Sequence, residues 1–413
     1  MHRAAGFGYE WANTAPSGRD PMNEAETTAQ AAAARAAANP ADPTARTPLQ
    51  VIHLPNGSFR EAFITIPALG REEPADLFQR LYDFLDDHPG WHIARQDVFG
   101  VVGDLRSCHP PKSFRLNGAE WPVTWVVEGN GYGNPVAGIQ VHAVAGVPIQ
   151  AVRVGGRTVG TVFEDAAARY CVLGGLRPAT ASGTRSDQVR ETFDLIETAL
   201  AQVGMDFSRV FRTWFYLDNI LDWYDEFNHV RNEFFKRHKV YDGLVPASTG
   251  IGGSNSAGTA IVADVLAIEP RDPRVRLEAV PSPLQCPALE YGSSFSRAVE
   301  LPLPGQRRIT ISGTASIAPG GATAHVGDVE KQVALTMDVV AAILRSRQMD
   351  WADVTRAIGY LKHAEDALAF DLYCTRNRLP ALPVIIAKND ICRDDLLFEI
   401  EVDAARVEPG VTR

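Results

Sequence analysis

The chain has 413 residues, of which 45% are hydrophobic and 22% charged, a composition typical of a globular protein with enough length for two or three domains. Its uninterrupted apolar runs, such as residues 339–344, are far shorter than the roughly 18 to 20 residues that a transmembrane helix needs, which argues against an integral membrane protein. Forty Lys and Arg against fifty Asp and Glu give a net charge of −10, so there is no basic footprint for nucleic acid. Any anionic substrate must therefore be held by a few placed arginines.

The cysteines and histidines do not form a recognisable disulfide or metal pattern. The five cysteines include no CxxC pair, which argues against a disulfide framework and a zinc ribbon and predicts a cytoplasmic protein. The ten histidines show neither HExxH nor HxH spacing, so we predict no metal site.

The first part of the chain changes character near residue 49. Residues 1–48 are rich in Ala, Thr, Pro and Asn and have few side chains to bury, so we expect a disordered extension. Residues 49–184 predict an N-terminal α/β domain, with a helix at 76–88, strands at 121–127 and 138–144, and a hairpin at 153–165.

The later part of the chain contains an internal repeat. Residues 191–217 and 333–361 each predict an amphipathic helix, a short turn and an alternating strand. The two copies match at a constant offset: Val210, Arg212, Tyr216 and Leu217 correspond to Val354, Arg356, Tyr360 and Leu361.

Each copy continues in the same way and predicts one unit of an α+β fold. Second amphipathic helices are expected at 220–238 and 367–378, each followed by a loop and a final strand pair. Strands at 291–301 and 307–317 would complete a ββαβαββ-like sandwich. We therefore predict two α/β sandwich units in tandem, at 185–280 and 281–413, rather than a Rossmann fold or a TIM barrel.

Several stretches together resemble the RidA superfamily (YjgF/UK114), and within it the chorismatases, which carry two such units in one chain. They include SSFSRAV, ISGTAS, HVGDVEKQ, FRTWFYL, VPASTGIGG and RDDLLFEIE. The resemblance covers about residues 190–405 and implies an enzyme for a small anionic substrate, without metal or organic cofactor. It also implies a homo-oligomer, a trimer by analogy.

Glu399 is the predicted catalytic acid. Strand alternation puts Leu397, Glu399 and Glu401 on one face and Phe398 and Ile400 on the other. The plain interpretation is an outward-facing pair of carboxylates. The alternative is a carboxyl group in a semi-apolar setting with a raised pKa, suited to proton donation. The resemblance favours the second, because the chorismatase glutamate at this place protonates the enolpyruvyl methylene of chorismate.

The chain departs from the RidA-type imine deaminases at three positions. Their substrate-binding arginine is Val384 here, and their tyrosine and glutamine are Phe295 and Arg297. Imine hydrolysis is therefore disfavoured. Arg297 has a counterpart in chorismatases and is a candidate carboxylate clamp; the alternative is a surface arginine.

Cys392 and Gly313 are expected to govern the product. The resemblance links this glycine and cysteine pair with chorismatases that form 3-hydroxybenzoate, and alanine at both places with those that stop at a dihydroxycyclohexadiene carboxylate. A thiol or thiolate beside the ring would steer loss of water. The alternative for Cys392 is a small buried hydrophobic residue.

Arg212 and Tyr216 share one face of their strand, and Arg212 is a second candidate for anion binding. The matching Arg356 in the other copy allows a structural role instead. Thr249 and Gly250 begin a Gly-rich loop that is either an anion-binding nest or a plain turn. Tyr360 is a weaker substrate-binding candidate.

The sequence thus predicts a cytoplasmic chorismatase that cleaves chorismate to pyruvate and a hydroxybenzoate. The alternatives are a RidA-like hydrolase of another small imine or enamine, and a protein of the same fold that binds a ligand without catalysis.

Overall fold

The computed structural model describes residues 47–56, 59–100, 121–127 and 134–408. The extension predicted to be disordered lies outside these residues, apart from its last two positions. All the described residues belong to one compact unit, Pro43–Arg413.

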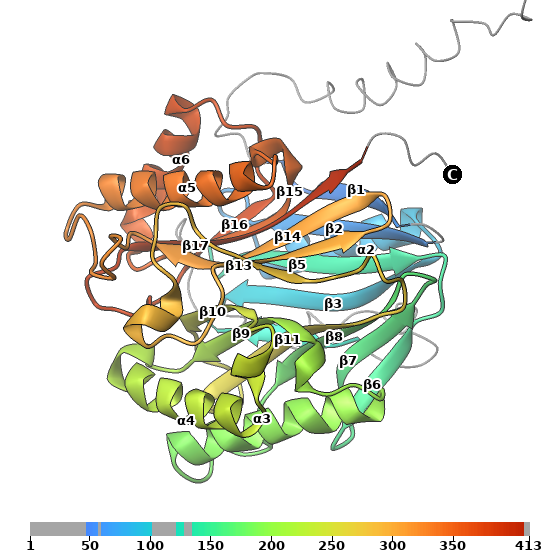
Figure 1. Cartoon of the computed structure of the whole chain (residues 1–413). Helices are drawn as coiled ribbons and strands as arrows, with labels where there is room; N and C mark the ends of the chain where they lie inside the picture. The colour runs from blue at the N-terminus through green and yellow to red at the C-terminus, as the bar shows by residue number, and fades with distance from the viewer. Residues whose placement is uncertain (1–46, 57–58, 101–120, 128–133, 409–413) are drawn as a thin grey trace, which may run out of the picture. The chain divides into compact units, whose positions relative to one another are not determined.

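Three sheets, each drawn from a consecutive stretch of chain, make up the described structure (Figure 1). The first has five strands in the order β1-β2-β5-β3-β4 and is covered by helix α2 (Pro74–Asp87). Its strands are β1 (Gln50–Asn56), β2 (Phe59–Pro67), β3 (Trp91–Gly100), β4 (Val123–Val126) and β5 (Val136–Ala145).

The second sheet has six strands in the order β10-β9-β11-β8-β7-β6, with helices α3 (Arg185–Gln202) and α4 (Tyr224–Arg237) packed on one face (Figure 1). Its strands are β6 (Gln150–Val154), β7 (Arg157–Glu164), β8 (Ala168–Leu176), β9 (Val210–Leu217), β10 (Ala247–Gly252) and β11 (Ile261–Pro270).

The third sheet repeats this arrangement in the order β12-β13-β14-β17-β15-β16, under helices α5 (Val329–Ser346) and α6 (Ala367–Arg376). Its strands are β12 (Glu278–Val280), β13 (Ala298–Leu303), β14 (Gln306–Ala315), β15 (Val354–Leu361), β16 (Val384–Lys388) and β17 (Phe398–Val407). The predicted α+β fold with two RidA-like units is confirmed.

The N-terminal sheet has the same topology as the two repeat units. In each sheet a hairpin leads through a helix to a strand, and the last strand returns between them. The neighbouring pairs β3/β4, β9/β10 and β15/β16 are all parallel. The sequence predicted an α/β segment here but not this third copy, because strand order depends on pairing between distant residues.

The second sheet begins earlier than the predicted unit boundary at residue 185. Strands β6, β7 and β8 come from residues assigned by sequence to the N-terminal domain. The predicted hairpin at 153–165 corresponds to β6 and β7, and β8 pairs with β7. The other partner of β8 is β11, which follows about ninety residues later and leaves no local signal. The division of the chain into functional domains stays a prediction.

Local signals explain why the repeat units fold alike. Thr184 caps α3 and accepts a hydrogen bond from the Asp187 backbone amide, and Asp328 caps α5 in the same way through Lys331. Asp206 and Asp350 cap the short turns that lead into β9 and β15. The matched N-caps fix where each helix begins and where each turn into the following strand begins.

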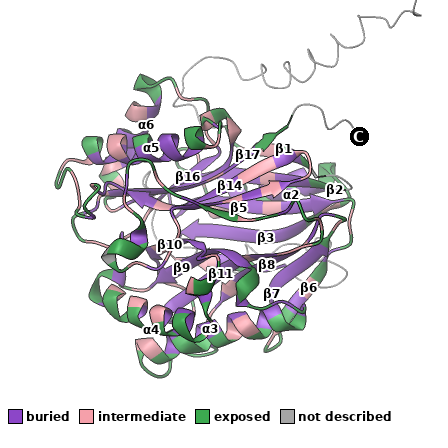
Figure 2. Cartoon of the chain, in the orientation of Figure 1, coloured by how far each residue is buried: buried purple, intermediate pink, exposed green. Residues whose placement is uncertain are grey.

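Alternation along the strands separates two buried layers (Figure 2). Phe215 packs under α3 and α4, while its neighbours Trp214 and Tyr216 face the other sheets. At the junction of the three sheets the Phe99 ring packs edge-on against Tyr216 and Tyr360, with centroids 6.2 Å and 6.3 Å apart. The units are therefore joined by an apolar layer that the helices do not touch.

Candidate active site

The predicted site residues gather where the second sheet meets the third. Strand β10 packs against β14, and the amide of Gly313 on β14 donates to Thr249 Oγ1 on β10 over 3.1 Å. Glu399 on β17 lies beside this contact. We call the group formed by Glu399, Gly313, Thr249, Cys392 and Arg297 the Glu399 site.

Glu399 is buried, in agreement with the interpretation of a carboxyl group in a semi-apolar setting rather than an outward-facing carboxylate. Its neighbours Phe398 and Ile400 face the helices, so the carboxyl group faces the sheet junction, and only 5% of the residue is exposed. Burial, with a smaller contribution from the charge of Glu401, raises its pKa to about 8 against the opposing effect of Arg212 and Arg297. At pH 7 most of this carboxyl is protonated and able to donate.

Gly313 leaves room for the Glu399 carboxyl. A Cβ atom built at Gly313 would lie 3.0 Å from Cδ of Glu399, closer still to Oε1, and 3.2 Å from the Thr249 methyl group. Any side chain at 313 would therefore displace the carboxyl, which sits at the end of a flexible side chain. This residue sets the position of the acid.

Glu401, two residues further along β17, is held as a carboxylate. Arg212 Nη2 lies 2.9 Å and Arg356 Nη2 2.7 Å from its oxygens, and Trp214 Nε1 donates to it over 2.8 Å. These cations, with hydrogen bonds from Thr249 and Trp214, lower its pKa although burial opposes them. Glu399 therefore favours the protonated form and Glu401 the ionised form, so Glu399 can donate a proton while Glu401 stays negatively charged.

Arg212 pairs with Glu401, which favours a structural role for this arginine over binding of an anionic substrate. Its Nη2 group donates to both Glu401 and Thr249, over 2.9 Å and 2.7 Å. Arg356, its counterpart in the repeat, binds the same carboxylate. Arg212 therefore bridges the second and third sheets, whereas Arg356 and Glu401 both belong to the third, and the positive charge of Arg212 lowers the pKa of Glu399.

The structure corrects the predicted loop at Thr249 and Gly250. Both residues lie in strand β10, which pairs with β9 in parallel. The Thr249 hydroxyl donates to Glu401 over 2.6 Å. A Cβ atom at Gly250 would touch the Tyr224 ring at 3.4 Å, so a larger side chain there would press on α4.

Tyr216 and Tyr360 belong to the apolar junction. Both rings are fully buried, and neither hydroxyl has a hydrogen-bond partner among the described residues. The strand register places Tyr360 directly opposite Glu399. Burial raises the pKa of both phenols well above the usual value, so both stay neutral.

Cys392 lies close enough to Glu399, and to an arginine that sequence reasoning missed, for both charges to act on its thiol. Burial, followed by the charge of Glu399, raises the pKa of this thiol to about 12, which favours the thiol over the thiolate. Arg393 and, to a smaller extent, Arg231 on α4 oppose that shift; Arg231 is itself buried, and its Nε has no hydrogen-bond partner among the described residues. Its position on the apolar face of α4, four residues after Phe227, was the available signal.

Arg297 lies close enough to Glu399 to lower its pKa. Its Nε and Nη2 groups donate to the Cys286 carbonyl over 3.0 Å and 2.8 Å, and the guanidinium lies over the Phe295 ring. Arg297 is only 5% exposed, so it is not the surface arginine that the sequence left as the alternative.

The other two sheets carry no carboxyl group at the position of Glu399. The register pairs the three junction aromatic residues with different partners: Tyr360 with Glu399, Tyr216 with Val262, and Phe99 with Gly138. A Cβ atom at Gly138 would lie 2.9 Å from the Ile385 side chain, so that place is filled. The threefold topology therefore yields one acid rather than three.

Within the described ranges, no three His, Cys, Asp or Glu side chains are grouped to hold a metal ion. None of the helices in this part of the chain is long and apolar enough to cross a membrane.

Comparison with known proteins agrees with the topology. The endoribonuclease L-PSP family model matches residues 174–254. The chain is 28% identical over 261 residues to a 3-hydroxybenzoate synthase from Streptomyces hygroscopicus, covering 56% of this chain and 73% of that protein. A chorismatase from the same organism is 29% identical over 213 residues, which is 46% of this chain and 60% of the relative.

The alignment with a crystal structure of a chorismatase covers 76% of this chain and 93% of the chorismatase chain, with a TM-score of 0.55 and 22% sequence identity. That identity supports a shared fold. Together with the family match and the two relatives, it confirms the resemblance seen in the sequence: the chain contains an endoribonuclease L-PSP (RidA) domain and is similar to the chorismatases.

Proposed function

We propose that the protein is a chorismatase that cleaves chorismate into pyruvate and 3-hydroxybenzoate. The observation that carries the proposal is Glu399, a buried carboxyl group with a pKa of about 8 beside a glutamate held ionised. An enol ether needs an acid of this kind, since its cleavage begins with protonation of a carbon atom.

In the proposed reaction Glu399 transfers its proton to the methylene carbon of the enolpyruvyl ether. The double-bond electrons form the new C–H bond, and the adjacent carbon becomes an oxocarbenium ion next to the newly ionised Glu399. Water adds to that carbon, and the hemiketal collapses by breaking the bond to the ring oxygen. One proton of the added water returns to Glu399, and the other passes to the ring oxygen as the hemiketal collapses. Pyruvate leaves, and the ring keeps a hydroxyl group.

The identity of the ring product depends on a second step, the loss of water from the ring. The ring diol left by hydrolysis has consumed one water, and releasing one water from it gives the aromatic hydroxybenzoate. Pyruvate and 3-hydroxybenzoate together therefore have the composition of chorismate itself. Gly313 and the neutral Cys392 thiol support this outcome, because the first sets where the acid lies and the second is a weak proton donor beside it.

Arg297 and Arg231 are the proposed partners of the substrate carboxylates. Both are buried; Arg297 is close enough to act on the charge of Glu399, and Arg231 is close enough to act on Cys392. A chain with a charge of −10 can bind a dianion in this way because the positive charge is local and desolvated. We propose that Arg212 acts indirectly, by keeping Glu401 ionised.

The RidA-type imine hydrolase is the weaker candidate. The position that carries its arginine is Val384, which packs into the core beneath α5 and α6. The cytoplasmic location, expected from the cysteine pattern, and the threefold association, implied by the resemblance, stay predictions.

The test is incubation of the purified chain with chorismate, with pyruvate coupled to lactate dehydrogenase and the ring product identified by chromatography. We expect pyruvate and 3-hydroxybenzoate in equal amounts. Pyruvate with only a ring diol would retain the cleavage and reject the product assignment. No pyruvate would overturn the proposal.

A further inference from the structure

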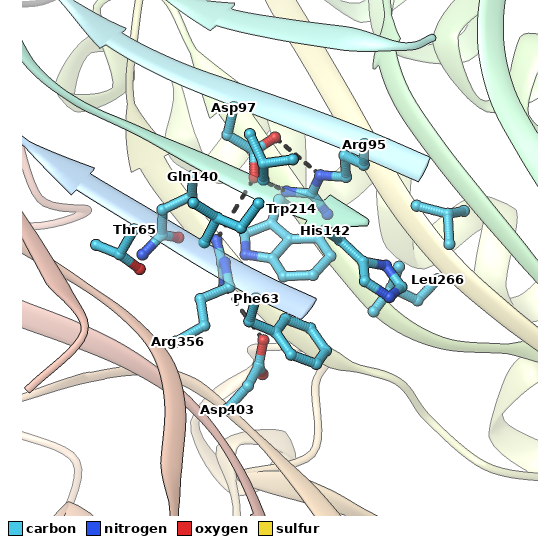
Figure 3. A pocket seen from close by; sticks show the side chains of 13 residues that line it. Phe63, Thr65, Arg95, Asp97, Gln140, His142, Trp214, Leu266, Arg356 and Asp403 are labelled. Carbon is cyan, nitrogen blue, oxygen red and sulfur yellow. Dashed lines mark hydrogen bonds and ion pairs between the residues drawn. The ribbon is translucent and has the colours of Figure 1, made fainter. Parts of the chain in front are cut away.

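Two cavities lie at the junction of the three sheets, apart from the Glu399 site. Their volumes are about 40 and 90 Å³, and neither is lined by Glu399, Gly313 or Cys392. They share five lining residues: Phe63, His142, Val172, Leu266 and Asp403. Figure 3 shows the smaller one, with Asp403 and Arg356 on one side and Phe63 and His142 beside them.

The larger cavity, which we call the junction cavity, has mostly apolar walls. Aromatic rings from the first two sheets, among them Phe63, Phe163 and Phe211, face aliphatic side chains of the third, such as Leu301 and Ile309. Its volume is several times the ~10–15 Å³ that one water occupies and below the ~150 Å³ of an engineered cavity that binds benzene. The space therefore fits a body larger than one water and smaller than a benzene ring.

The charged groups of the junction cavity are already paired. Glu61 forms ion pairs with Arg308 and with His142, the latter over 2.9 Å. Asp403 lies 3.3 Å from Arg356. A charged ligand would find no unneutralised partner among these groups, so a neutral ligand fits best.

Two polar atoms of this cavity nevertheless have no hydrogen-bond partner within the described part of the chain. They are Oγ1 of Thr310 and Oδ1 of Asp403, and both atoms are buried. Thr310 on β14 is directly opposite Asp403 on β17, so the two side chains leave the same face of the sheet. Thr310 itself is 7% exposed and lines the larger cavity. An unpaired buried polar atom is costly, which points to a missing partner between them.

We propose that the junction cavity binds a short-chain neutral alcohol, with its hydroxyl group between Thr310 and Asp403. One hydroxyl both donates and accepts: it donates to Asp403 Oδ1 and accepts from the Thr310 hydroxyl. The alkyl group lies among the aromatic and aliphatic walls. This site is separate from the Glu399 site and does not depend on the proposed reaction.

The test measures binding of 2-propanol to the full chain by ligand-observed NMR titration in sealed tubes, with propane as the analogue that lacks the hydroxyl. Thr310→Val removes the unpaired hydroxyl at nearly constant shape. Thr355→Val is the matched control: this threonine lines the same cavity, but its hydroxyl already donates to the Asp403 carbonyl over 3.2 Å.

We expect 2-propanol to bind the wild type and Thr355→Val alike, and Thr310→Val roughly tenfold more weakly, as for loss of a buried hydrogen bond. Propane should bind the wild type roughly tenfold more weakly than 2-propanol. The inference is overturned if 2-propanol does not bind, as for a cavity filled by water alone, or if propane binds equally well. It is also overturned if Thr310→Val binds 2-propanol like the wild type, which would place the alcohol elsewhere.

Discussion

Replacing Glu399 with glutamine tests the buried acid through protein stability, without any substrate. The folded state holds the pKa of this carboxyl at about 8, against 4.5 for an exposed glutamate. The folded protein therefore favours the protonated form. Below pH 4.5 Glu399 is protonated in both states and does not lower the free energy of unfolding, which then falls as the pH rises from 4.5 to about 8.

The magnitude follows from the free energy of 1.36 kcal/mol for each pH step between the two pKa values. The ionisable group costs about 3 kcal/mol at pH 7 and about 5 kcal/mol above pH 8, as upper estimates. Glutamine resembles the protonated acid and does not ionise. Glu399→Gln should therefore match the wild type near pH 4.5 and become more stable by a few kcal/mol at pH 8.5.

The assay is urea denaturation of both proteins at several pH values. Glu401→Gln is the control with the opposite sign, because it leaves Arg212 and Arg356 without their carboxylate and should destabilise the protein by about 3–5 kcal/mol at neutral pH. If the stability difference between Glu399→Gln and wild type does not change between pH 5 and pH 8.5, the raised pKa is wrong.

Three further predictions concern the site. Gly313→Ala should displace the Glu399 carboxyl and shift the ring product from 3-hydroxybenzoate towards the diol, with a loss of about 1–3 kcal/mol in the free energy of unfolding; chromatography of an unchanged product mixture would contradict this. Arg231→Met should raise KM for chorismate at least tenfold, as for loss of a charge-assisted hydrogen bond, and an unchanged KM in steady-state assays would remove the arginine from the substrate site. Cys392, with a thiol pKa of about 12, should react with iodoacetamide at pH 8 at least a hundredfold more slowly than a free cysteine by mass spectrometry, whereas rapid labelling would indicate a thiolate.

Features encoded within a short stretch were predictable. The constant offset between the repeats gave matching helices α3 and α5 and matching strands β9 and β15. Alternation in LLFEIE correctly put Glu399 on the face away from Phe398. These signals succeed because helix and strand periodicity is local.

Features that depend on distant partners were not predictable. Arg212 binds Glu401, which is 189 positions away, so its structural role could not be distinguished from anion binding. Thr249 was assigned to a loop because its glycine neighbours disfavour strands, and parallel pairing with β9 overrides that tendency. Arg231 was passed over because a charged residue within an amphipathic helix is ordinarily solvated.

The central claim, that Glu399 donates the proton which starts cleavage, is tested most directly by the pH dependence of kcat/KM for pyruvate release from chorismate, because kcat/KM reports the pKa of the free protein. We predict a constant rate at lower pH and a decline of about tenfold per pH unit above about 8, because the acid must be protonated. A rate that rises through pH 8 would contradict the claim.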